Sequence, residues 1–215
     1  MEYYERYWKK ELEEKGFASK PPEWEECNLS RIMNLIKPHC FGKVLDIGCG
    51  DGFFTSQLNN LDTVKKVTGV DISKTAIQIA EKKFAEIDFV VAPVVELPFP
   101  NESYDFVSMI EIVEHILDIE QMFKEVNRIL KPMGSVVITT TDFNLLKKII
   151  IAIFFWEKYF YPTNPHIRFF TKQTLKESLN KTGFEVFKYK WNGSYAGIMP
   201  KGQIVLAKKI KTISL

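Results

Sequence analysis

Cysteine is scarce in this chain, and its few thiols are scattered. The three residues, Cys27, Cys40 and Cys49, form no CxxC pair and are odd in number. Disulfide frameworks use paired cysteines, and structural zinc sites need clustered ligands. The sequence therefore predicts neither a disulfide framework nor a zinc site, and it favours a reducing, cytoplasmic setting.

An excess of one charge sign is also missing. Lys and Arg number 29 against 27 Asp and Glu, which gives a formal net charge of +2. A protein that binds a phosphate backbone normally concentrates basic side chains on one face. We therefore expect no nucleic-acid partner.

No long apolar run is present. The longest, residues 149–156, has eight residues, whereas a membrane-spanning helix needs about 20. The first residues are charged throughout and do not resemble a secretory signal. We expect a chain that does not cross a bilayer, and its 215 residues are compatible with one domain.

Short apolar runs alternate with helix-like stretches, a pattern typical of βαβ units around a parallel sheet. Strands are predicted at 43–48, 64–71, 88–92, 104–110 and 135–141, and helices at 2–16, 28–37, 53–60, 73–86 and 119–130. Beyond residue 142 we expect an apolar helical insertion, then a helix capped by Thr171 and closed by Gly183, then a strand pair at 184–191 and 202–210.

The segment from Val44 to Gly52 reads VLDIGCGDG, a buried strand followed by a turn with glycine at alternate positions. Glycine lets the backbone approach a ligand closely and adopt positive φ at low cost. Nineteen residues after Gly52, the next strand ends at Asp71, where a carboxylate can accept hydrogen bonds from ribose hydroxyls. This arrangement predicts a nucleoside site at the carboxyl ends of the strands.

The glycine spacing distinguishes between nucleoside ligands. A dinucleotide fingerprint is GxGxxG, but this chain has GxGxG with Phe53 after the last glycine. Asp46 lies two residues before the first glycine. A carboxylate at this turn repels a pyrophosphate and attracts a cation, so the pattern favours a cationic nucleoside such as S-adenosylmethionine.

With these residues in view, the sequence resembles the class I S-adenosylmethionine-dependent methyltransferases. The resemblance covers most of residues 40–142 and rests on VLDIGCGDG, GVDIS, ELPFPNESYDFVSMIEIVEHI and RILKPMG in this order. The third of these resembles small-molecule enzymes that include quinone-biosynthesis methyltransferases. It implies a doubly wound, mostly parallel seven-stranded sheet with an antiparallel closing hairpin and a helical insertion.

The resemblance also implies roles for individual residues. The methionine moiety would lie against Asp46, Gly48, Cys49 and Gly50, and Asp71 would bind the ribose. Contacts to the adenine would come from Ile72, Val94 and Val95, and Ile110 would lie beside the sulfonium. The chain departs from the family at Pro93, where relatives often carry an acid for the adenine amino group, so packing and the Val94 N–H would hold the base.

Candidate residues for the acceptor side are fewer. His115 and His166 are the candidate catalytic residues, although each is equally compatible with a structural role. The acceptor is predicted to contact Arg168 and three aromatic side chains near the N-terminus, Tyr4, Tyr7 and Trp8. These aromatic residues form either a lid or plain packing. No set of clustered oxygen ligands is evident, so no metal site is expected.

We interpret residues 1–215 as one domain. Its parts are a helical lid (1–40), a cofactor-binding core (41–142), a helical insertion (143–170) and a C-terminal helix with a strand hairpin (171–215). Within the insertion, residues 143–161 have three possible roles. They are expected to be buried against the domain or a second copy of the chain, or to form an apolar wall over the acceptor. The third alternative is that they rest on a membrane surface with Lys147, Lys148 and Lys158 outward.

The sequence thus predicts transfer of a methyl group to O, N or C of a small, partly apolar molecule. Two other functions are compatible with the same fold. One is a cofactor-binding but non-catalytic partner subunit of another transferase. The other is an NAD-dependent oxidoreductase, which Phe53 and Asp46 at the turn disfavour.

Overall fold

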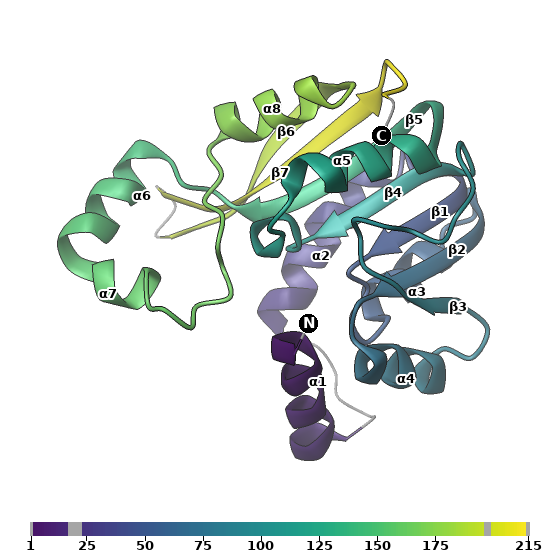
Figure 1. Cartoon of the computed structure of the whole chain (residues 1–215), viewed down its shortest axis with the longest axis horizontal. Coiled ribbons are helices and arrows are strands. Elements are labelled where there is room, and N and C mark those ends of the chain that lie inside the picture. The colour runs from purple at the N-terminus through teal and green to yellow at the C-terminus, as the bar shows by residue number, and fades with distance from the viewer. Residues whose placement is uncertain (1, 17–22, 196–198, 214–215) are drawn as a thin grey trace.

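The computed structural model describes residues 2–16, 23–195 and 199–213, which form a sheet with helices on both faces (Figure 1). The strands are β1 (Gly42–Ile47), β2 (Val64–Asp71), β3 (Asp88–Val91), β4 (Tyr104–Ile110), β5 (Leu130–Thr141), β6 (Phe184–Tyr195) and β7 (Met199–Lys209). The helices are α1 (Glu2–Lys15), α2 (Glu23–Ile36), α3 (Phe53–Asn59), α4 (Lys74–Lys83), α5 (Ile119–Ile129), α6 (Leu145–Ile150), α7 (Trp156–Tyr159) and α8 (Lys172–Lys181), with short turns η1 (Val113–His115) and η2 (Ile151–Phe155).

The sheet has the order β3-β2-β1-β4-β5-β7-β6. Strands β1 to β5 pair in parallel, and β7 runs antiparallel to both β5 and β6. The predicted doubly wound sheet with an antiparallel closing hairpin is therefore confirmed. The chain moves outward from β1 to β3 and returns to place β4 on the other side of β1. Ligands bind at such a switch point, beside the carboxyl ends of the strands.

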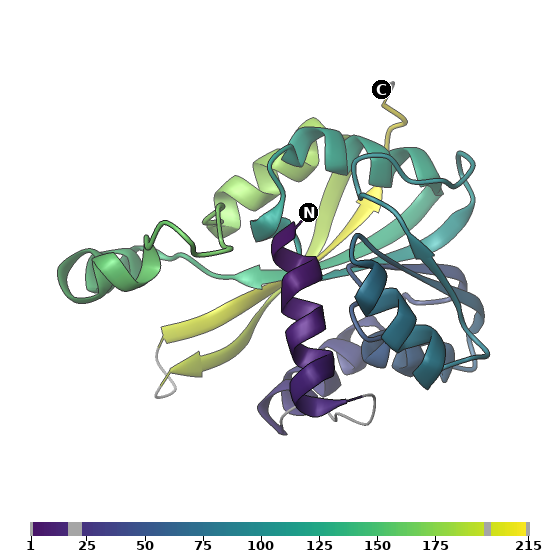
Figure 2. The ribbon, with the colours of Figure 1, turned by 60° about the horizontal axis from the view of Figure 1, so that its bottom comes forward.

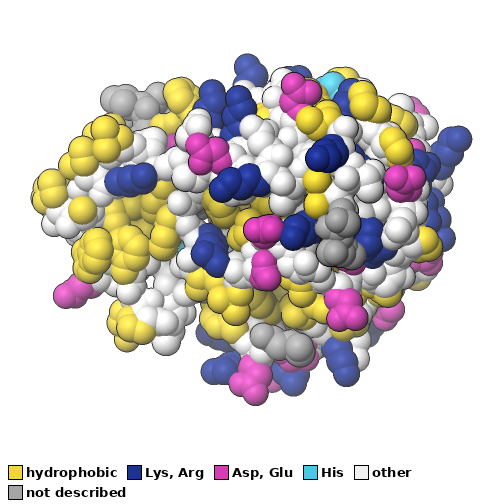
Figure 3. All heavy atoms as spheres, turned by 45° about the horizontal axis from the view of Figure 1, so that its top comes forward, with side chains coloured by type: hydrophobic (Ala, Val, Ile, Leu, Met, Phe, Trp, Pro, Cys, Tyr) yellow, Lys and Arg dark blue, Asp and Glu magenta, His cyan; other side chains and the backbone are white. Residues whose placement is uncertain are grey.

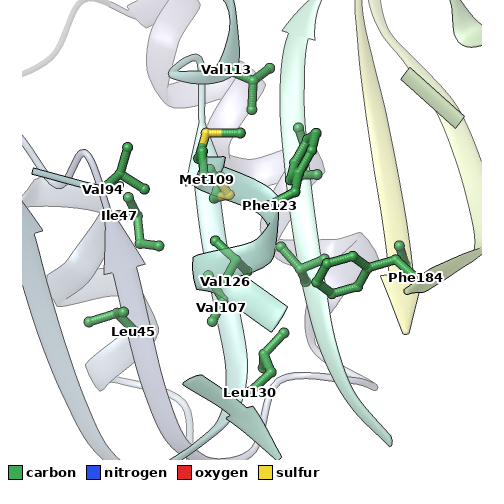
Figure 4. Packing of buried hydrophobic residues seen from close by; sticks show 14 of the residues in the cluster. Leu45, Ile47, Val94, Val107, Met109, Val113, Phe123, Val126, Leu130 and Phe184 are labelled. Carbon is green, nitrogen blue, oxygen red and sulfur yellow. The ribbon is translucent and has the colours of Figure 1, made fainter. Parts of the chain in front are cut away.

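Alternate residues of the central strands enter two separate cores, as the two-residue period of a strand requires. Leu45 and Ile47 face the core that contains Phe123 of α5, whereas Val44 faces the core formed with α2, α3 and α4. Figure 4 shows the first core, where Phe123 and Phe184 pack over β4 and β5. Burying each such side chain stabilises the fold by roughly 1.5–3 kcal/mol, which fixes the strand ends that carry the site.

Several element boundaries differ from the sequence prediction, two of them by five residues. Helix α2 begins at Glu23, five residues earlier than expected. Strand β5 begins at Leu130, five residues before the predicted start at residue 135, because Leu130 already pairs with Tyr104. The register shifts between this pair and the rest of the strand, where Met133 has φ 64°. The predicted cap at Thr171 is confirmed, since its hydroxyl accepts from the Thr174 N–H.

The insertion is helical, as predicted, but it is broken and largely exposed. A π-helical stretch, η2, separates α6 from α7, and Ile151 is the one apolar side chain of 145–161 that is buried. Lys147 was predicted to point outward, and this prediction is wrong. Its side chain is buried, and its Nζ donates to the Lys201 carbonyl at 3.0 Å. Figure 3 shows the apolar side chains gathered at this end of the molecule. None of the helices in the described ranges is long and apolar enough to span a membrane.

Candidate functional site

The turn after β1 forms one wall of a cavity at the switch point. Gly48 and Gly50 adopt φ values of 73° and 52°, which disfavour a side chain. A Cβ at Gly48 would lie 2.7 Å from Ile112 Cδ1, and one at Gly50 would lie 2.7 Å from the Trp8 ring. Both glycines therefore keep the backbone open to a ligand and close to neighbouring side chains.

Asp71 lies at the carboxyl end of β2 and faces the same cavity. Its two carboxylate oxygens accept hydrogen bonds from the backbone N–H groups of Gly50 (3.0 Å) and Ser73 (2.9 Å). These bonds fix the orientation of the carboxylate and leave lone pairs available to a ligand. Burial nevertheless raises the pKa of Asp71, and the two N–H bonds oppose that rise.

Asp46 is fully buried beside the turn and does not line the cavity. It accepts hydrogen bonds from Thr55 Oγ1 at 2.7 Å and Ser108 Oγ at 2.6 Å. Burial raises the pKa of Asp46 to about 6, although these two hydroxyls lower it and the charge of Asp71 raises it further. The Asp46 carboxylate therefore does not contact a ligand in the cavity. It affects the cavity through its charge and through its hydrogen bonds beside the end of β1.

Helix α1 lies across the ends of the central strands (Figure 2). Glu5 attaches it to the start of α4 by accepting from Ser73 Oγ at 2.8 Å and Thr75 Oγ1 at 2.6 Å. The Thr75 and then the Ser73 hydrogen bonds lower the pKa of Glu5 to about 2. The carboxylate is therefore charged at neutral pH, and α1 covers the turn at Gly50 with Trp8.

Removing the Glu5 carboxylate is expected to loosen α1. Glu5→Ala loses charge-assisted hydrogen bonds that each contribute about 1.5–3 kcal/mol, and we expect amide hydrogen exchange in α1 to accelerate at least tenfold. Hydrogen exchange with mass spectrometry measures this directly. Glu13→Ala, an exposed site on the same helix, is the matched control. Equal exchange in both variants would show that Glu5 does not secure the helix.

The opposite end of the cavity is formed by the segment after β4 and by the loop after α7. His115 Nδ1 lies 3.0 Å from the Pro165 carbonyl, which only accepts, so Nδ1 carries the proton. The His115 and His166 rings are 4.7 Å apart, and Tyr4 packs on His115 at 5.6 Å. Burial lowers the pKa of both histidines, which favours neutral rings at pH 7.

Two carboxyl groups also meet here. Glu111, at φ 52°, lines the cavity, and Glu114 is 1% exposed. Neither carboxylate oxygen of Glu114 has a hydrogen-bond partner among the described residues. Burial, followed by the charge of Glu111, raises the pKa of Glu114 well above its ordinary value. Glu114 is therefore a buried carboxyl group that favours its neutral form, and it lies on the same segment as His115.

The cavity has a volume of about 620 Å³ and unites most of the predicted residues. It brings together side chains and backbone from the lid, the glycine turn, the second strand and the acceptor side. The predicted residues that line it are Tyr4, Tyr7, Trp8, Gly48, Gly50, Asp71, Ile72, Val94, His115 and His166.

Five predicted residues do not line the cavity. Besides Asp46, these are Cys49 and Ile110, which belong to the core beneath α3 and α4, and Val95, which packs on the opposite core. Arg168 is exposed and donates to the carbonyl groups of Ile116 and Leu117. For Asp46, the next residue of β1, Ile47, lines the cavity instead, because alternate strand residues point in opposite directions.

The sequence interpretation did not single out Glu5, Glu111 or Glu114. A signal existed for the last two, since Glu111, Glu114 and His115 follow directly after a predicted strand of the sheet. Glu5 had no comparable signal, because its partners Ser73 and Thr75 lie about 70 residues away in the chain. No metal ligands were expected either, yet Glu114, His115 and His166 place their ligand atoms within 4.8 Å of one another.

A doubly wound sheet, a glycine turn and a carboxylate at the end of β2 define a Rossmann-like domain that binds a nucleoside cofactor. Residues 45–138 match the family model described as a methyltransferase domain. The chain is accordingly similar to the class I S-adenosylmethionine-dependent methyltransferases, which use S-adenosylmethionine, and among them to quinone-biosynthesis members.

Individual relatives support this assignment. A ubiquinone biosynthesis O-methyltransferase of Bradyrhizobium diazoefficiens is 36% identical over 52% of this chain and 45% of its own length. A demethylmenaquinone methyltransferase of Staphylococcus aureus is 29% identical over 72% of each chain. A crystal structure of a putative methyltransferase from Bacillus halodurans shares the fold, with a TM-score of 0.71 at 15% identity over 85% of this chain and 99% of that one. The chain spans about half the length of the first curated relatives it matches.

Proposed function

We propose that the protein transfers the methyl group of S-adenosylmethionine to an O, N or C atom of a small, partly apolar molecule. The observation that carries this proposal is the continuity of the cavity. One space joins Asp71 and the glycine turn to His115 and His166. A nucleoside cofactor and a second small molecule can therefore lie end to end in it.

The residues present fit this cofactor. Asp71 would accept from the ribose hydroxyls, and Gly48 and Gly50 leave backbone room where any Cβ would collide with Ile112 or Trp8. Ile72 and Val94 would pack on the adenine. The buried charge of Asp46 would favour a cationic ligand at this turn and disfavour a pyrophosphate.

When bound, the cofactor supplies an electrophilic methyl group on a positively charged sulfur. The chain's own residues would contribute alignment and the exclusion of water. Helix α1 covers the cavity with Tyr4, Tyr7 and Trp8. Neutral His115 and His166 would contact the acceptor, and an imidazole near pH 7 can take a proton from a hydroxyl acceptor.

The relatives suggest the acceptor class. Because similar enzymes are named for ubiquinone and menaquinone biosynthesis, we propose a hydroxylated aromatic or quinone-like acceptor and a cytoplasmic site of action. We further propose that the exposed apolar face of 145–161 contacts a membrane surface or a second copy of the chain. Liposome co-sedimentation tests the first partner, and size-exclusion chromatography with light scattering tests the second.

Calorimetry tests the cofactor assignment. We expect titration with S-adenosylmethionine and S-adenosylhomocysteine to release heat and titration with NAD to release none. Transfer of labelled methyl to hydroxylated aromatic compounds then tests the reaction. Tighter binding of NAD would identify an oxidoreductase, and cofactor binding without transfer to any compound of a broad extract would identify a non-catalytic subunit.

A further inference from the structure

We propose that a groove between α6, α8 and β6 binds a phosphate ester, with the phosphate on its lysines and an attached apolar ring or chain on its aromatic side. The groove has a volume of about 590 Å³. Figure 1 shows the three elements at the end of the molecule that carries the insertion. The groove shares no lining residue with the cavity that contains Asp71 and the two histidines. It is therefore a separate site, and it does not depend on the proposed function.

Three lysines line the groove, each from a different element. They are Lys148 of α6, Lys172 of α8 and Lys190 of β6. In the described ranges, none of the three forms an ion pair with a carboxylate. Lysines elsewhere on the sheet do form such pairs, for example Lys66 with Asp88 at 2.6 Å. Unpaired like charges in one groove repel one another, and an anionic ligand would offset this repulsion.

The acidic side chains near the groove have other partners. Asp142 lines the groove, but it is 3% exposed and accepts from Asn144 Nδ2 at 2.8 Å. Burial lowers the pKa of Lys147, and the charge of Asp142 opposes that change, so Asp142 compensates a buried ammonium group. Glu177 accepts from Gln173 Nε2 at 2.7 Å, one turn further along α8. The positive charge of the three lysines therefore stays available to a ligand.

Two aromatic side chains of β6 and one leucine give the groove an apolar side. Trp191 lines the groove and is 66% exposed, although tryptophan is usually well buried. The Lys172 ammonium group lies 4.6 Å from the centre of the Tyr189 ring, a cation–π contact that holds this lysine at the groove. Leu145 lines the groove from α6 and is 73% exposed. A ring or chain attached to the anion can pack on Trp191 and Leu145.

A phosphate fits this groove better than a carboxylate does. A phosphate monoester carries about 1.5–2 negative charges at pH 7 and has three strong acceptor oxygens. Lysine binds phosphate as a point charge, so ammonium groups from three elements can each contact a different oxygen. The apolar side chains beside them favour an esterified phosphate over the inorganic ion. Free aryl or alkyl phosphates and the headgroups of anionic phospholipids both present this chemistry.

Calorimetric titration of the full chain with phenyl phosphate tests the groove. We expect one site per chain with a submillimolar Kd, and binding of inorganic phosphate and of phenol that is weaker by at least about tenfold. Lys172→Ala and Lys190→Ala should each weaken phenyl phosphate binding by at least about threefold, because each removes one ammonium group. Lys176→Ala is the matched control and should leave Kd unchanged, since this exposed lysine lies on α8 but does not line the groove.

A second variant tests the apolar side of the groove. Trp191→Ala should weaken binding of phenyl phosphate and leave the affinity for inorganic phosphate unchanged, because it removes only a packing surface. An excess of S-adenosylhomocysteine should not displace phenyl phosphate, because the groove and the cavity share no residue. Circular dichroism checks that each variant folds.

Vesicles distinguish the two sources of the phosphate ester. Co-sedimentation with vesicles of phosphatidylglycerol and phosphatidylcholine that both lysine variants reduce, and none with phosphatidylcholine alone, would identify a lipid headgroup. Binding of phenyl phosphate without binding to either vesicle would identify a free phosphate ester.

Four results would overturn the proposal. These are no binding of phenyl phosphate or anionic vesicles, parental affinity in both lysine variants, equal affinity for phenyl phosphate and inorganic phosphate, and displacement of phenyl phosphate by S-adenosylhomocysteine. A chain that binds phenyl phosphate but not S-adenosylmethionine would keep the groove and overturn the proposed function.

Discussion

Substitution of Asp71 with alanine is expected to lower the affinity for S-adenosylmethionine by at least about 100-fold. The carboxylate would accept hydrogen bonds from two ribose hydroxyls, and a hydrogen bond to a charged group contributes about 1.5–3 kcal/mol. Losing both costs roughly 3 kcal/mol or more, and each 1.4 kcal/mol is a factor of ten in Kd. The variant also loses the bonds that hold the Gly50 and Ser73 N–H groups.

Calorimetry on parent and variant measures this loss. Asp71→Asn is the informative companion, because its side-chain oxygen can still accept one backbone bond while the charge is gone. We expect its affinity to fall between those of the parent and of Asp71→Ala. An alanine variant with parental affinity would remove Asp71 from the cofactor site and leave the glycine turn as the main support for the assignment.

Asp46→Asn is expected to stabilise the cofactor-free protein at pH 7. Burial raises the pKa of Asp46 from its ordinary 3.8 to about 6, so the folded state resists ionisation of a group that the unfolded state ionises easily. A difference of one in pKa between the folded and unfolded states corresponds to about 1.4 kcal/mol, and the penalty at pH 7 is therefore roughly 3 kcal/mol. Asparagine has nearly the same shape and carries no charge, which removes this penalty.

The direction of the Asp46 pKa shift determines the pH range over which stability changes. The folded state holds the Asp46 proton more tightly than the unfolded state, so its contribution to stability is fully present below pH 3.8 and is lost as the pH rises through about 6. The free energy of unfolding of the variant should therefore exceed that of the parent by an amount that grows between pH 4 and 6. Comparing the two proteins at each pH isolates Asp46 from other titrating groups.

Urea unfolding at pH 4, 5, 6 and 7 measures the difference in free energy of unfolding between parent and variant. Asp105→Asn is the control, because its effect on stability should have the opposite sign. Although burial opposes it, the hydrogen bonds from Lys131 and the Lys43 N–H lower the pKa of Asp105. That variant should lose stability at pH 7. We also expect Asp46→Asn to bind S-adenosylmethionine more weakly. A variant with reduced stability at pH 7 would contradict the argument.

The parts of this protein that could be predicted from sequence are those governed by local pattern. The two-residue alternation of β1, β4 and β5, the cap at Thr171 and the glycine turn all follow from spacing within a few residues. Asp71 could be located because it ends a strand that follows the turn at a characteristic interval. These features determine the nucleoside half of the cavity.

The acceptor half depends on contacts across long stretches of chain. His166 meets His115 only because the loop after α7 is bonded to the Glu114 carbonyl, about 50 residues away. The break between α6 and α7 and the burial of Lys147 likewise depend on tertiary contacts. Local propensity carries no information on such pairs, which is why the candidate metal ligands did not stand out in the sequence.

The attachment of α1 has a consequence for how fast the protein can work. The helix covers the cavity through Trp8 and is fastened by Glu5 to the start of α4. If the demethylated cofactor leaves on the side that α1 covers, the Glu5 bonds to Ser73 and Thr75 would have to break first. Product release, rather than the chemical step, would then limit the turnover rate, as in many enzymes with a lid over the active site.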